Sequence, residues 1–157
     1  MSLDLQDVCA SFCALAKVPA PSLQAQNDGT VAFNVQYRGV TVDLAAQPGI
    51  DATHAYVLFH MGELDPAHAD CGRILLALLH TNFVNLRANQ PVLSCRPSTH
   101  MATLQWAFPL AETTGENLLQ LIEQGVDLVL QWRQTHFLAP DAAQPGAVLS
   151  DAIASYA

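Results

Sequence analysis

The sequence predicts an α+β domain in which helices pack on a mostly antiparallel sheet. Apolar residues recur with helical spacing in three segments and alternate with polar residues in most of five others. The elements follow the order helix, three strands, helix, two strands, helix. With 157 residues, of which 51% are hydrophobic, the chain can form one domain with a genuine core. We expect this domain to span residues 1–138, followed by an Ala/Pro-rich tail at 139–157.

The first helix is expected to begin near Ser2, which can cap it, and to end before Pro19. Pro19 and Pro21 remove backbone donors and push the residues before them out of the helical region. Its apolar stripe comprises Leu5, Val8, Cys9, Phe12 and Ala16, with Leu15 at the edge.

Three strands are expected after the turn signal at residues 27–30. Residues 31–37 and 40–46 alternate between apolar and polar side chains, and Arg38-Gly39 joins them, so they predict a β-hairpin with one dry face. Residues 54–64 carry large apolar side chains on both faces. This pattern predicts a strand covered on two sides.

The second helix is expected to open at Asp65-Pro66 and to run to about Asn82. Strands at residues 92–96 and 101–110 should follow, separated by a turn. Thr113 and Glu116 have the spacing of a capping box for the third helix. The dry face of that helix comprises Leu118, Ile122, Val126 (or Gly125), Val129 and Trp132. The tail has weak periodicity and is expected to be loosely ordered, with at most a short helix.

The charge distribution argues against several classes of partner. The formal net charge is -8, and the six cations are scattered singly, so no basic stripe is available for nucleic acid or for an anionic membrane surface. The N-terminal sequence lacks the basic region of a signal peptide, and no apolar run approaches the ~20 residues of a spanning helix. We therefore expect a cytoplasmic protein with reduced cysteines and without membrane insertion.

No catalytic or metal-binding constellation stands out. Cys9 and Cys13 share a helical face, but partner ligands at familiar spacing are missing, so buried cysteines are the better interpretation. The histidines are scattered, and no nucleotide-binding or hydrolase motif is present. The sequence thus predicts a binding protein and not an enzyme, with no metal and no cofactor.

The second helix carries six consecutive apolar residues, Ile74 to Leu79, which is more than one dry face requires. On a helical wheel, the side expected to cover the sheet comprises Cys71, Leu75, Leu78, Leu79 and Asn82. The opposite side carries Leu76, Ala77, His80 and Phe83 beside Arg73. We expect this second side to form a contact between two copies of the chain. Two alternatives are that the helix is buried inside the fold, for instance under the third helix, or that these residues are simply exposed.

Several segments resemble the class I type III secretion chaperones of the Tir-chaperone family. The segments are "VAFNVQYRGVTVDL", "HAYVLFHMGELD", "ILLALLHTNF" and "ATLQWAFPLAETTGENLLQLIEQGVDLVLQW", and the resemblance covers about residues 1 to 138. It implies a non-enzymatic homodimer in the bacterial cytoplasm, with much of the dimer contact through the second helix. It also implies that the protein holds the N-terminal segment of a secreted effector in extended form and keeps it soluble and ready for export.

On this resemblance, we expect the effector segment to dock on the first helix and the neighbouring hairpin. The candidate contact residues are Phe12, Leu15, Phe33 and Tyr37. An exposed strand edge would let the segment add as a further strand, with alternate side chains in pockets. The alternatives are an adaptor of the same fold for another protein, and a small ligand-binding or enzymatic domain with a Cys/His pocket.

Overall fold

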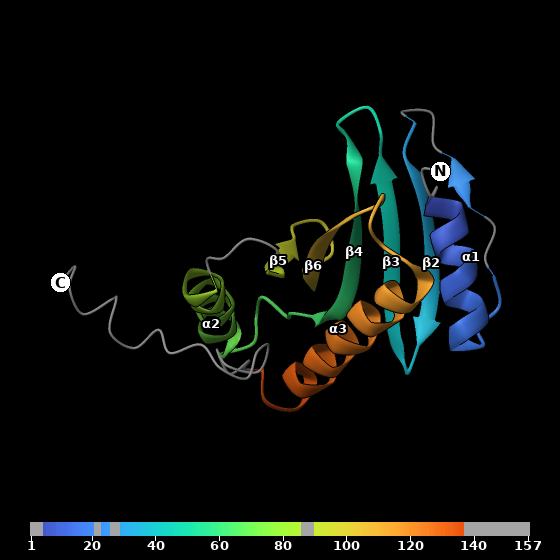
Figure 1. Cartoon of the computed structure of the whole chain (residues 1–157). Helices are drawn as coiled ribbons and strands as arrows, with labels where there is room; N and C mark the ends of the chain where they lie inside the picture. Colours follow the sequence, from blue (N-terminus) through green and yellow to red (C-terminus); the bar gives the residue numbers. More distant parts are fainter. Residues whose placement is uncertain (1–4, 21–22, 26–28, 86–89, 137–157) are drawn as a thin grey trace, which may run out of the picture.

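A six-stranded antiparallel sheet with strand order β1-β2-β3-β4-β6-β5 organises the protein (Figure 1). The computed structural model describes residues 5–20, 23–25, 29–85 and 90–136. The elements are α1 (Leu5–Ala16), β1 (Gln24–Ala25), β2 (Val31–Tyr37), β3 (Val40–Gln47), β4 (Asp51–Glu63), α2 (Cys71–Val84), β5 (Val92–Arg96), β6 (Met101–Pro109) and α3 (Gly115–Thr135). The predicted α+β class and order of elements are confirmed, and the two-residue β1 is the one addition. The predicted tail at 139–157 lies outside the described residues.

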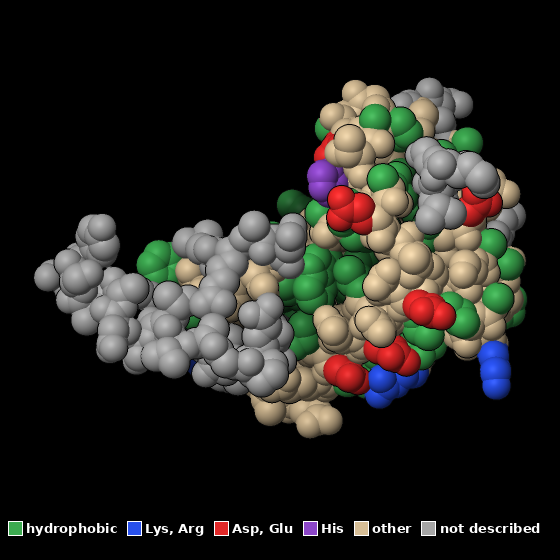
Figure 2. All heavy atoms as spheres, in the orientation of Figure 1, with side chains coloured by type: hydrophobic (Ala, Val, Ile, Leu, Met, Phe, Trp, Pro, Cys, Tyr) green, Lys and Arg blue, Asp and Glu red, His purple; other side chains and the backbone are tan. Residues whose placement is uncertain are grey.

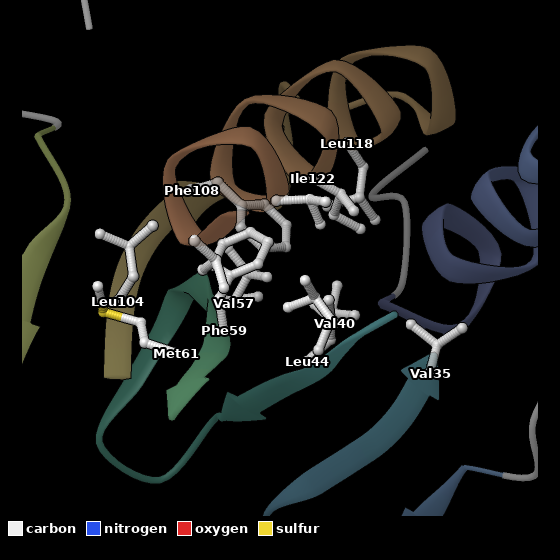
Figure 3. Packing of buried hydrophobic residues seen from close by; sticks show 14 of the residues in the cluster. Val35, Val40, Leu44, Val57, Phe59, Met61, Leu104, Phe108, Leu118 and Ile122 are labelled. Carbon is white, nitrogen blue, oxygen red and sulfur yellow. The ribbon is translucent and has the colours of Figure 1, made fainter. Parts of the chain in front are cut away.

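The core lies between one face of the sheet and the helices α1 and α3. Figure 3 shows Val57 and Phe59 of β4 beneath Ile122 of α3. The apolar stripe predicted for α3 is buried throughout, and α1 buries the stripe from Leu5 to Cys13. The opposite face of β4 is only half-buried at Tyr56 and Leu58. The prediction that this strand is covered on two sides is therefore wrong, because among the described residues no helix lies over that face.

The β2–β3 hairpin is closed by a two-residue turn. Tyr37 pairs with Val40, and both turn residues have positive φ, 49° at Arg38 and 77° at Gly39. These angles belong to a type I′ turn, whose twist matches that of the flanking strands. The turn predicted at Arg38-Gly39 is confirmed.

The N-cap of α3 lies one residue later than predicted, at Thr114. The Thr114 side chain accepts from the Asn117 backbone N–H, and the Asn117 side chain accepts from the Thr114 N–H, which completes a capping box. Thr113 instead donates its hydroxyl to the Pro109 carbonyl at 2.6 Å. The predicted pair of Thr113 and Glu116 is thus displaced by one position.

The C-terminal half of α3 is tied to the sheet by Arg133. Its guanidinium donates to the carbonyls of Met61 (2.7 Å), His60 (2.9 Å) and Gly39 (3.0 Å). The β4–β6 register shifts between His60 and Gly62, and such a bulge removes backbone groups from the ladder. Arg133 supplies donors at this bulge and links it to the hairpin turn.

Helix α2 begins at Cys71, not at the predicted Asp65-Pro66. The Asp65 carboxylate accepts from the Ala67 N–H at 2.9 Å, so this residue stabilises a turn before the helix. Near its other end, the Asn82 side chain bonds both backbone groups of Leu93 in β5, each at 2.8 Å. Figure 1 shows α2 beyond β5, at the end of the sheet opposite to α1.

Candidate functional site

Helix α2 exposes most of its large apolar side chains. Leu76 is 68% exposed, Leu79 64%, Phe83 59% and Leu75 37%. These four residues are called here the α2 apolar face. At 100° per residue they fall within about 100° of the helix circumference. They therefore form one continuous stripe and not scattered single residues.

Only a narrow strip of α2 faces the rest of the chain. Ile74 and Leu78 are its buried residues, and Asn82, half-buried, bonds to β5. The predicted sheet-facing side is therefore partly wrong: Leu78 is buried, but Leu75 and Leu79 are exposed. The reason is that α2 packs on the edge strand β5, which covers less of a helix than an open sheet face does.

The residues predicted for the dimer contact lie largely on the surface. Leu76, His80 and Phe83 are exposed, whereas Ala77 is half-buried at the border of the packed strip. Burial of Leu76 and Phe83 inside the fold is excluded by their exposure in the single chain. Leaving such side chains in water forgoes roughly 1.5–3 kcal/mol each relative to burial. A continuous exposed apolar stripe of this kind is a candidate surface for protein contact.

The four residues predicted to bind an effector divide into two pairs. Phe12 and Phe33 are buried in the core and offer no surface in this conformation. Leu15 is 44% exposed, and Tyr37 is half-buried. The Tyr37 ring packs edge-on against Phe12, with ring centroids 6.3 Å apart. Of these four residues, only Leu15 and Tyr37 present side chains at the surface.

Tyr37 also connects the hairpin to α3. Its hydroxyl donates to the Glu123 carboxylate at 3.2 Å, and Arg38 beside it pairs with Asp127 at 2.8 Å. Burial and the hydrogen bond to Glu123 raise the pKa of the Tyr37 phenol above its ordinary value. Both acidic partners, Glu123 and Asp127, lie on α3. Figure 2 shows acidic side chains spread around exposed apolar ones on this face.

The edge of the sheet next to α1 offers backbone groups. β1 pairs with β2 only at Val31 and Ala32. In a two-residue hairpin the pair beside the turn is hydrogen-bonded, so alternate residues of β2 direct both backbone groups outward. Counting from Tyr37, these residues are Gln36 and Asn34. In the described part of the chain, no assigned strand pairing covers these two positions.

The cysteines and histidines form no reactive centre in the described residues. Cys9 and Cys13 are buried, as predicted, and burial raises the pKa of the Cys13 thiol. His60 contacts Asp43 at 2.6 Å and His54 contacts Asp51 at 3.0 Å, each as a separate pair. Within the described residues, no group of three or more potential ligands could hold a metal ion. Nor does any described helix combine the length and apolar character that crossing a bilayer requires.

The fold is similar to that of several solved structures. A chain of the ExsC–ExsE complex matches with 15% identity and a TM-score of 0.64, covering 86% of this chain and 95% of that one. A chain of the HopA1–SchA chaperone–effector complex matches with 12% identity and a TM-score of 0.55, covering 82% and 91%. A chain of the ExoT–SpcS complex from Pseudomonas aeruginosa matches with 16% identity and a TM-score of 0.53, covering 80% and 94%. At these identities the similarity shows the fold.

A family model agrees with this structural similarity. No curated protein matches the chain significantly in sequence. The model of the Tir chaperone protein (CesT) family matches residues 10–133, which include most of α1 and nearly all of α3. The chain therefore belongs to the Tir chaperone protein (CesT) family, whose members are chaperones and not enzymes.

Proposed function

We propose that this protein is a homodimeric type III secretion chaperone. It binds the N-terminal segment of a secreted effector in extended form and keeps it soluble and export-competent in the bacterial cytoplasm. The α2 apolar face, on a chain that belongs to the Tir-chaperone family, is the observation that carries this proposal. The similar structures named above are of complexes, and one is titled a chaperone–effector complex, which supports a protein client.

The dimer forms through α2. Leu76 and Phe83 lie at the centre of the contact, His80 beside them, and Ala77 at its border, with Leu75 and Leu79 extending it. A two-fold axis brings the same stripe from each copy together, so the free energy of burying each side chain is gained once in each copy. Val92 of β5, which is also exposed, widens the apolar surface on the strand next to α2.

The effector segment docks at the opposite end of the sheet. Leu15 and Tyr37 provide apolar surface there, and Phe12 supports the Tyr37 ring from the core. The outward backbone groups of Asn34 and Gln36 can accept an added strand. Because an extended segment loses conformational entropy on binding, its affinity should depend on a few such anchors.

Co-expression with the proteins encoded beside the chaperone tests this function. We expect a secreted protein to co-purify through its N-terminal segment, with one copy per chaperone dimer by light scattering. Leu15→Asp should reduce this recovery without changing the mass of the free chaperone. A matched control is Ile50→Asp, which places the same charge on a side chain that is 81% exposed in the β3–β4 turn. A monomeric chaperone at micromolar concentration, or no captured N-terminal segment, would contradict the proposal.

A further inference from the structure

The β5 edge of the sheet is an obvious second place for a strand to add. β5 is only five residues long, and β6 occupies its inner side. In an antiparallel ladder, alternate residues direct both backbone groups away from the paired strand. The Leu93 N–H and carbonyl both point toward α2, where they bond Asn82. Because outward residues alternate, the outward residues of β5 are Leu93 and Cys95. An added strand would need both of them.

The Asn82 side chain of α2 already bonds the two outward backbone groups of Leu93. Its Oδ1 accepts from the Leu93 N–H and its Nδ2 donates to the Leu93 carbonyl, each at 2.8 Å. A side-chain amide carries one carbonyl acceptor and an N–H donor, as a peptide group does. The Asn82 side chain therefore takes the place of one residue of a neighbouring strand. Leu93 itself is buried, so its backbone groups would be costly to leave unpaired.

The other edge has no comparable closure in the described residues. Asn34 and Gln36 direct their backbone groups outward, and both side chains point to the uncovered face of the sheet. There they bond Asp43 and Thr41 of β3, each at 2.6 Å, and not the edge of their own strand. Two consecutive outward positions are enough to begin a ladder with an extended peptide. The two edges of the sheet thus differ in whether their outward backbone groups are free to pair with an added strand.

We infer that Asn82 is a positioning residue that closes the β5 edge to strand addition and so directs an extended client to the β1–β2 edge. The same two hydrogen bonds fix α2 against the sheet and set which side of the helix remains exposed. The part of this inference that concerns the client rests on the proposed chaperone function. The closure of the β5 edge can be measured without any client.

Amide exchange tests the closure. Asn82→Ala removes both bonds, and we expect the Leu93 amide to exchange about fivefold to tenfold faster, because one hydrogen bond is lost. Asn82→Leu keeps the branched shape of the side chain and leaves no cavity, so the same acceleration in this variant would be due to the lost bonds. Thr81→Ala is the matched control: it removes a bond within α2, from Thr81 to the Ala77 carbonyl, and should leave the Leu93 amide protected. Unchanged Leu93 exchange in both Asn82 variants would overturn the inference.

Edge selection is tested with a short synthetic peptide of alternating Val and Thr residues that carries a nitroxide label. In the wild-type protein and in Thr81→Ala, paramagnetic broadening of amide signals should be confined to the region of Asn34 and Gln36. In Asn82→Leu, broadening should also appear at Cys95 and Leu93. A merely structural role for Asn82 would not change which edge the peptide contacts.

The outcomes separate this inference from the proposed function. Broadening at Cys95 in the wild-type protein, equal to that at Asn34, would show an open β5 edge and overturn the inference alone. Faster Leu93 exchange without peptide contact at either edge would count against strand addition itself, and therefore against the proposed binding mode and edge selection together.

Discussion

Helices α3 and α2 are both rich in apolar residues, but they use them in opposite ways. α3 buries a complete stripe from Leu118 to Trp132, and Arg133 ties it to β4 and to the β2–β3 turn. α2 buries Ile74 and Leu78 and exposes the α2 apolar face. α3 therefore completes the core of one chain, whereas α2 presents apolar side chains that remain exposed in the single chain.

The glycines of the two helices show the same contrast. A methyl group at Gly125 of α3 would fall inside contact distance of the Phe59 ring, so helix and sheet approach closely there. A methyl group at Gly72 of α2 would meet nothing within 4 Å. Close approach without a side chain marks a contact that is already complete. The open space around α2 fits a helix whose partner is another molecule.

The largest expected effect concerns the α2 apolar face. Leu76→Asp places a charge in the proposed contact of both copies, and should weaken self-association by about 3–6 kcal/mol, twice the value of one such side chain. Light scattering should then report a monomer or an aggregate where the wild-type protein is a dimer. Ile50→Asp should leave the dimer intact. An unchanged dimer in Leu76→Asp would move the interface elsewhere.

The next effect contrasts the two helical glycines. Gly125→Ala forces the Phe59 ring to shift, and overpacking of this kind costs roughly 1–3 kcal/mol. Alanine itself favours a helix by about 1 kcal/mol over glycine, so the net loss of stability should be about 0–2 kcal/mol. Gly72→Ala lacks the clash and should be neutral or stabilising. Denaturant unfolding measures both, and equal effects would remove the contrast between α3 and α2.

A smaller effect is expected at Arg133. Arg133→Met keeps the apolar stem but loses all three carbonyl contacts, and because the side chain is largely exposed we expect a loss of about 1 kcal/mol. Amide exchange near Gly39 and Met61 should also increase. Arg73→Met on α2 is the control, since the Arg73 guanidinium pairs with Asp70, three residues earlier in the chain. A larger loss of stability in Arg73→Met than in Arg133→Met would contradict the view that α3, and not α2, completes the core.

The smallest effect is a pH dependence at the junction of the hairpin and α3. The Tyr37 pKa is raised in the folded protein, so its contribution to stability is present below the ordinary pKa of about 10 and is lost as pH rises through the folded value. Glu123→Gln removes a neighbouring negative charge and should lower the pKa of Tyr37 toward its ordinary value. An NMR titration of the Tyr37 ring measures the shift, with Tyr56 as an internal reference. A rise in the Tyr37 pKa would contradict this assignment.

Most of the fold could be predicted because the spacing of apolar residues in most elements allows only one face to be buried. In the β2–β3 hairpin, alternation leaves only one face to bury, and the Arg38-Gly39 turn fixes the register. In α3, apolar residues repeat on one stripe among polar ones, so the buried side follows directly. The cap of α3 was misplaced by one residue because Thr113 and Thr114 are adjacent, and only the backbone path decides which hydroxyl faces the helix start.

The exposure of the residues proposed to contact a client could be predicted less completely. Phe12 and Leu15 lie on α1, and Phe33 and Tyr37 lie on β2. Their exposure depends on how α1 rests against α3, where Gly115 allows close contact with Ser11. That packing buries Phe12, and the core of which it is part also buries Phe33, leaving Leu15 and Tyr37 at the surface. Sequence periodicity cannot decide this, because it gives the face of an element and not what covers it.

The sequence by itself determined the α+β order of elements, the dry faces of the hairpin and α3, and the excess of apolar residues in α2. Only the tertiary structure decided which of those residues are exposed. Because six consecutive apolar side chains from Ile74 to Leu79 surround the helix, a helical wheel does not show which side of α2 faces the rest of the chain. The contact with β5, through Ile74, Leu78 and the two bonds of Asn82 to Leu93, sets that side and leaves Leu76, Leu79 and Phe83 exposed.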